Sequence, residues 1–169
     1  MRVGIIGVGG VGHLGIQFAN AFGCEVTAFS TTPEKEAEAR ELGADRFICI
    51  RDNAAMAAAN DSLDFILSTV HADLNWMQFA TMLRVDGKLC LVGVPQQPVS
   101  IPAGLLLSAR RSICGSMIGS RAMMHETLEF AARHGIKAMT ETMPIAGVNE
   151  ALDKVRRNRA RYRMVLALE

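Results

Sequence analysis

What the sequence has little of already excludes several classes of protein. The formal net charge of the 169-residue chain is +1 at pH 7, which excludes a strongly basic nucleic-acid binder and a polyanionic chain. Hydrophobic residues make up 50% of the chain, which excludes a disordered tail. No apolar run reaches the ~18–20 residues of a membrane span, and the first residues lack the pattern of a signal peptide. We therefore expect a globular domain with neither a nucleic-acid nor a membrane partner.

Cysteine is also scarce, and its spacing excludes two common kinds of site. Cys24, Cys49, Cys90 and Cys114 lie far apart, and no two of them form a Cys-x-x-Cys pair. This spacing suits neither a zinc knuckle nor the disulfide framework of a small secreted domain. We expect reduced core thiols in a cytoplasmic protein, and no metal site in this chain.

Short apolar runs alternate with helix-period segments along the whole chain, whose length suits one domain. The runs are apolar at consecutive positions, as expected of strands buried on both faces. The expected strands are 3–7, 25–30, 46–50, 63–70, 88–93 and 112–118, with a last one at 164–168. The expected helices are 12–22, 33–42, 54–59, 74–83, 121–134 and 148–157. This alternation predicts an α/β fold, a doubly wound parallel sheet of about six strands flanked by helices, known as the Rossmann fold.

The segment 94–107 interrupts the alternation with three prolines. We expect a loop that ends in a short helix near Leu105. Its expected place is the edge of the sheet, where subunits often pair.

A glycine motif follows the first expected strand. Gly7-Val8-Gly9-Gly10-Val11-Gly12 matches Gly-x-Gly-x-x-Gly and opens a helix, which is the context of a dinucleotide-binding loop. Gly7 permits the tight turn, Gly9 lets the backbone approach a pyrophosphate, and Gly12 lets the helix pack closely on the strand. The free amides of the helix N-terminus then face the phosphates. A glycine-rich turn without a ligand is the alternative.

The end of the second strand indicates which dinucleotide binds. An NAD site usually has Asp or Glu there, to hold the 2′-hydroxyl of the ribose. This chain has Ser30, followed by Thr31 and Thr32, and Lys35 comes one turn later. Hydroxyl groups and an ammonium accept a 2′-phosphate, so we predict NADP(H) rather than NAD(H). Ser30–Thr32 could instead only cap the following helix, and Glu34 argues mildly against NADP(H).

Several segments resemble the zinc-dependent medium-chain alcohol dehydrogenases, and most closely their cinnamyl alcohol dehydrogenase branch. The resemblance covers essentially the whole chain, with the motifs in the family's order. The segments are GVGGVGHLG at 7–15, FSTTP at 29–33, ELGAD at 41–45, DFILSTV at 64–70, GKLCLVG at 87–93, GSMIG at 115–119 and RYR at 161–163.

The resemblance implies an NADP(H)-binding Rossmann domain over residues 1–158. It also implies a terminal strand, 159–169, that returns to a catalytic domain outside this chain. Where the family often has a second basic residue just before Lys35, this chain has Glu34. The implied cofactor-binding residues are Gly7, Gly9, Gly10, Val11 and Gly12 at the pyrophosphate, Ser30, Thr31, Thr32 and Lys35 at the 2′-phosphate, Thr69 and Val70 at the ribose and cleft floor, Val92, Gly93, Val94, Ser116, Met117 and Ile118 around nicotinamide, and Arg163 at the phosphates.

The family's catalytic zinc has no ligand motif in this chain. In these dehydrogenases a zinc ion polarises the oxygen of the alcohol or aldehyde substrate, and its ligands precede the glycine loop. Only six residues precede the loop here. We therefore expect no catalytic and no metal-binding residue in the chain, and expect it to be the cofactor domain of a larger enzyme. The family also implies a homodimer formed through the sheet edge.

Other interpretations stay open at this point. A stand-alone regulatory dinucleotide sensor is disfavoured by Ser30 and by a terminal strand with little to pair with. A zinc-free quinone reductase is disfavoured by the intact glycine motif. His13 could contact a phosphate or pack against a neighbouring part, and His71 could lie near the cleft or in a solvated loop.

Overall fold

A six-stranded parallel sheet forms the centre of the molecule. The structure is a computed structural model that describes residues 1–168. The strands are β1 (Arg2–Ile6), β2 (Glu25–Ser30), β3 (Arg46–Cys49), β4 (Leu63–Ser68), β5 (Leu83–Leu91) and β6 (Ser112–Gly115). Their order in the sheet is β3-β2-β1-β4-β5-β6, and every neighbouring pair is parallel. This confirms the predicted doubly wound α/β fold, and its order reverses between β1 and β4, where ligands of such sheets bind.

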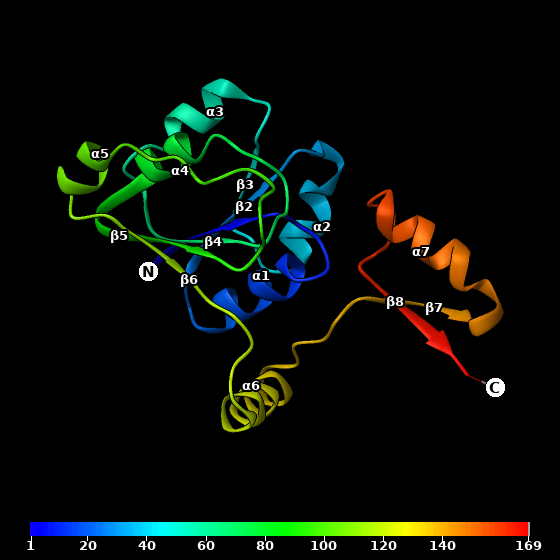
Figure 1. Ribbon diagram of the computed structural model, residues 1–169. Helices are drawn as coiled ribbons and strands as arrows, with labels where there is room; N and C mark the ends of the chain where they lie inside the picture. The colour runs from blue at the N-terminus through cyan, green and yellow to red at the C-terminus, as the bar shows by residue number, and fades with distance from the viewer. Residues whose placement is uncertain (169) are drawn as a thin grey trace.

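Seven helices connect and cover the strands of the described chain (Figure 1). They are α1 (Gly12–Ala21), α2 (Glu36–Glu41), α3 (Asn53–Ala58), α4 (Trp76–Met82), α5 (Ala103–Leu107), α6 (Arg121–His134) and α7 (Val148–Arg156). The predicted helix 33–42 is divided, because Pro33–Lys35 forms a 3-10 turn before α2. The helix predicted near Leu105 is α5, and α6 has the predicted bounds. Helix α6 is capped at its N-terminus by Ser120, whose hydroxyl accepts a hydrogen bond from the Met123 amide, and at its C-terminus by Gly135 in the left-handed conformation.

Each face of the sheet is covered by its own apolar cluster, which explains why the strands are apolar at consecutive positions. On one face, Met56 of α3 and Phe79 of α4 pack with Phe29 of β2. On the other, Ile16 of α1 and Ala39 of α2 pack with β1 and β2. The rings of Phe29 and Phe79 meet edge to face, 5.5 Å apart. The sheet is thus buried between two helical layers.

A second, two-stranded sheet lies beside the first. Its strands, β7 (Thr140–Pro144) and β8 (Arg163–Ala167), are parallel and are connected by α7. Figure 1 shows these three elements gathered at one side of the molecule, coloured orange to red. The expectation that the last strand has little to pair with is therefore wrong, because β8 pairs with β7. The sequence analysis did not predict β7 as a strand. β7 falls inside the predicted Rossmann segment 1–158, and the domain boundary at 158 stays a prediction.

Strand β5 also differs from its prediction, since it begins at Leu83 rather than at Lys88. Residues 84–86 are exposed, and Asp86 has a φ of 64° before Gly87, so the segment has the sequence of a turn. Among the described residues, no helix is both long and apolar enough to cross a membrane.

Candidate functional site

A cleft of about 490 Å³ opens at the carboxyl ends of β1, β2 and β4. The glycine loop forms one wall, the Ser30–Lys35 segment forms another, and Arg163 closes one side. Lys35 and Arg163 are cationic, and none of the described residues that line the cleft is acidic. A cleft of this kind, at the switch point of a doubly wound sheet, suits a ligand that carries phosphate groups.

The glycine loop is shaped by a close approach between α1 and β1. A Cβ atom at Gly12 would lie 1.7 Å from the carbonyl oxygen of Gly7, so no other residue fits there. A Cβ at Gly9 would meet nothing within 4 Å, which leaves open space above the loop for a ligand. The Thr69 hydroxyl donates to the Ile6 carbonyl at 2.9 Å and so ties β4 to the loop. The loop amides at the start of α1 are thereby held at the cleft.

The end of β2 places hydroxyl groups and an ammonium at the cleft. Ser30 is buried, and its Oγ accepts a hydrogen bond from the Thr32 amide at 3.1 Å. Lys35 Nζ donates to the Val8 carbonyl at 2.6 Å, which joins this segment to the glycine loop. Burial, and after it the nearby Arg161 charge, lowers the pKa of Lys35. An anion beside Lys35 would favour its charged form.

His13, in the first turn of α1, is fully buried and is a structural link rather than an exposed ligand. Its Nδ1 lies 2.9 Å from the Gly9 carbonyl, and its Nε2 accepts from the Met139 amide at 3.0 Å. Because the amide can only donate, the proton of the neutral ring sits on Nδ1. Burial lowers the pKa of His13, so the ring is neutral at pH 7. Of the two possibilities at this position, the structure places His13 in packing.

Tyr162 joins the second sheet to the first. Its ring stacks on His13 with the ring centres 4.9 Å apart, and its hydroxyl donates to the Glu38 carboxylate. The Lys35 ammonium lies 5.1 Å from the centre of the same ring. Burial, and after it the bond to Glu38, raises the pKa of Tyr162, so its hydroxyl stays protonated. Tyr162 therefore fixes the start of β8 against α1 and α2.

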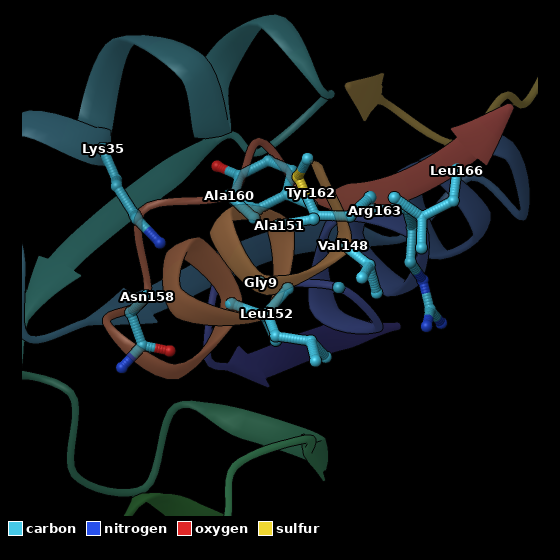
Figure 2. A pocket seen from close by; sticks show the side chains of 13 residues that line it. Gly9, Lys35, Val148, Ala151, Leu152, Asn158, Ala160, Tyr162, Arg163 and Leu166 are labelled. Carbon is cyan, nitrogen blue, oxygen red and sulfur yellow. The ribbon is translucent and has the colours of Figure 1, made fainter. Parts of the chain in front are cut away.

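A second pocket, of about 390 Å³, lies between the glycine loop and α7 (Figure 2). In this view Lys35 and Asn158 lie at one side, and Arg163 and Leu166 lie at the other. Arg163 Nε is 3.6 Å from the point where a Gly10 Cβ would stand, so its side chain lies directly against the glycine loop. Arg163 and Asn158 line both this pocket and the main cleft.

Comparison with known proteins identifies the family. The pattern of the family described as zinc-binding dehydrogenase matches residues 10–133, well over half of the chain. The chain belongs to the zinc-binding dehydrogenases. Its similarity to the cinnamyl alcohol dehydrogenase branch is also shown by curated relatives. A probable formaldehyde dehydrogenase of Bacillus subtilis is 43% identical over 165 residues, and cinnamyl alcohol dehydrogenase 2 of Oryza sativa is 41% identical over 167.

The chain spans about half the length of these relatives. Both alignments cover 98% of this chain, but only 47% and 46% of the respective relative. A solved cinnamyl alcohol dehydrogenase from Sorghum bicolor superposes with a TM-score of 0.94 at 37% identity, covering 98% of this chain and 47% of that one. A cinnamyl alcohol dehydrogenase from Helicobacter pylori, solved in complex with NADP(H), superposes at 0.86 with 26% identity over 98% and 47% of the two chains. The part matched is the cofactor-binding domain of this dehydrogenase family, whose members bind a nicotinamide cofactor.

The cleft brings together most, but not all, of the residues predicted for the cofactor. It is lined by Gly7, Gly9, Gly10, Val11, Ser30, Thr31, Thr32, Lys35, Thr69, Val70 and Arg163. Gly12 lies beneath it, at the contact between α1 and β1. The six residues predicted around nicotinamide do not line it, and stand after β5 and β6 instead: Val92, Gly93, Val94, Ser116, Met117 and Ile118. Met117 is 92% exposed and Ile118 87% exposed, so their place beside nicotinamide stays a prediction for this dehydrogenase domain.

The cleft also contains residues that sequence reasoning missed. Asn158 lies between α7 and β8 with a φ of 54° and lines the cleft. Its position depends on contacts between distant segments, so no local motif could have indicated it. His71, for which two positions were open, does line the cleft, and its Nδ1 accepts from the Val94 amide at 3.3 Å.

The residues of this chain do not fit the zinc ion that the family name implies. Within residues 1–168 there is no group of three or more His, Cys, Asp or Glu side chains that could hold a metal ion. The arrangement provides backbone amides, hydroxyl groups and two cations, which are groups that bind phosphates.

Proposed function

We propose that this chain is the NADP(H)-binding domain of an alcohol dehydrogenase or aldehyde reductase. The cofactor supplies or accepts a hydride, and the alcohol or aldehyde is the substrate of the complete enzyme. The single observation that carries the choice of NADP(H) is the end of β2, where Ser30 stands in place of the acidic residue of NAD sites. The two cations that line the cleft support the same choice.

Each wall of the cleft has a part in this proposal. The amides at the start of α1 hold the pyrophosphate, with Arg163 beside them. Ser30, Thr31, Thr32 and Lys35 hold the 2′-phosphate, for which Lys35 exchanges the Val8 carbonyl for an anion. The residues after β5 and β6 face the nicotinamide. A cytoplasmic location belongs to the proposal as well.

A regulatory dinucleotide sensor remains the alternative. The paired state of β8 removes one of the two arguments against it, since the strand does have a partner in β7. Ser30 remains the argument for an NADP(H) enzyme, and the matched relatives bear the names of dehydrogenases and reductases.

We predict that the chain binds NADPH more tightly than NADH, by tenfold or more, because a charged hydrogen bond contributes about 1.5–3 kcal/mol. Ser30→Asp should reverse the preference, since a carboxylate repels the 2′-phosphate and holds the 2′-hydroxyl. Ser62→Asp, at a partly buried serine before β4 and outside the cleft, is the matched control. Calorimetric titration with both cofactors measures the result, and tighter binding of NADH by the wild-type chain would refute the preference.

We further propose that the zinc ligands of the complete enzyme lie outside these 169 residues, since the chain covers about half of its relatives. The purified chain should then bind NADPH but oxidise no alcohol, with or without added zinc. The absorbance of NADPH at a series of alcohol and aldehyde concentrations measures turnover. Zinc-dependent turnover by this chain alone would show that it contains the catalyst.

The homodimer is proposed to form through the free edge of β6. This strand has a neighbour on one side only, and Ile113 on it is 36% exposed. Sedimentation velocity should show a dimer for the wild-type chain and a monomer for Ile113→Lys, whose charge opposes pairing. Val165→Lys, at a 42% exposed valine on β8 of the second sheet, should remain a dimer. A wild-type chain that stays monomeric at high concentration contradicts this assembly.

A further inference from the structure

A continuous chain of hydrogen bonds runs from the glycine loop to Arg163 through His13. His13 Nδ1–H donates to the Gly9 carbonyl at 2.9 Å, and the Met139 amide donates to His13 Nε2 at 3.0 Å. The Met139 carbonyl then accepts from the amides of both Tyr162 and Arg163, each at 3.0 Å. Three hydrogen bonds in series, through His13 and Met139, therefore connect the loop backbone to the backbone of Arg163.

The surroundings of His13 leave neither of its ring nitrogens available to a ligand. The side chain is fully buried, both ring nitrogens are engaged, and one ring face is stacked on Tyr162. The charged groups that act on it are Arg163, which disfavours its protonation, and Glu38, which favours it. A protonated ring would turn an N–H toward the Met139 amide, where an acceptor is needed. The link therefore requires the neutral ring.

The link through His13 is one of the contacts that join the segment of Arg163 to the glycine loop. Its side chain lies against Gly10, and it stands on β8, which pairs with β7 and not with the six-stranded sheet. The second sheet is joined to the glycine loop through His13, and to α1 and α2 through Tyr162. The guanidinium of Arg163 and the loop amides come from different sheets, so something must hold the two in register.

We propose that His13 is a positioning residue for the dinucleotide, which holds the Gly9 loop and Arg163 in register so that both meet the same pyrophosphate. The inference rests on the proposed function, because it assumes that the cleft binds a dinucleotide. His13 itself touches no ligand and acts through Arg163.

Two variants of His13 separate its two hydrogen bonds. In His13→Gln the longer side chain keeps an acceptor for the Met139 amide, and in His13→Asn the shorter one keeps only a donor for Gly9. We expect His13→Asn to weaken NADPH binding about tenfold, the size of one lost positioning bond. His13→Gln should stay within about threefold of the wild-type chain, because the backbone amide of residue 13 still donates to the Gly9 carbonyl at 3.0 Å and keeps the loop joined to this position. Adenosine 2′-monophosphate, which lacks the pyrophosphate, should bind all three proteins equally.

The decisive measurement is a double-mutant cycle with Arg163→Ala, read by NADPH titration. If His13 acts through Arg163, the tenfold loss of His13→Asn falls below about twofold in the Arg163→Ala background. Equal losses in both backgrounds, or no loss in either, overturn the proposed role while NADPH binding still stands. Absence of NADPH binding by the wild-type chain overturns the proposed function, and this inference with it.

A second measurement covers the case in which His13→Asn does not fold. Nitrogen-15 spectra of the wild-type imidazole should show a neutral ring protonated at Nδ1, and the Met139 amide should be protected from hydrogen exchange. A ring that exchanges between tautomers, with an unprotected Met139 amide, contradicts the link directly.

Discussion

The close contact of α1 with β1 is the constraint on which the rest of the site depends. At Gly12 the helix backbone approaches the Gly7 carbonyl so closely that a Cβ would stand 1.7 Å from it. This contact aims the free amides at the start of α1 across the end of the sheet, where the order of the strands reverses. The sheet provides the rigid base, since both of its faces are packed against helices. A phosphate site is thus built from backbone that the core holds in place.

The second sheet completes what the glycine loop begins. Arg163 on β8 and Asn158, in the loop between α7 and β8, both line the cleft. Strand β8 itself pairs with β7 and not with a strand of the six-stranded sheet. Tyr162 supplies the connection, because its ring touches His13, Lys35 and Arg161 and its hydroxyl reaches Glu38. The charges that line the cleft therefore depend on packing between segments more than a hundred residues apart in sequence.

The parts of the fold that depend on neighbouring residues in the sequence, such as the apolar strands and the glycine loop, could be predicted from the sequence. The inner strands β1 and β2 are apolar at consecutive positions because both of their faces are buried. All six strands of the central sheet were predicted, as was the glycine loop. β7 was missed because it begins with the polar residues Thr140, Glu141 and Thr142, has no buried residue, and pairs with β8. The role of His13 was left open for a related reason. Its partner Met139 is 126 residues away, and no spacing in the sequence indicates such a contact.

The most direct test is a crystal structure of this chain with NADPH. We expect the pyrophosphate to lie on the amides of Gly9–Gly12, beside Arg163. The 2′-phosphate should lie among Ser30, Thr31 and Thr32, with the Lys35 ammonium turned from the Val8 carbonyl, its acceptor at 2.6 Å, to the phosphate. A 2′-phosphate that points to solvent, with Lys35 still bonded to Val8, would contradict the assignment of the site to NADP(H).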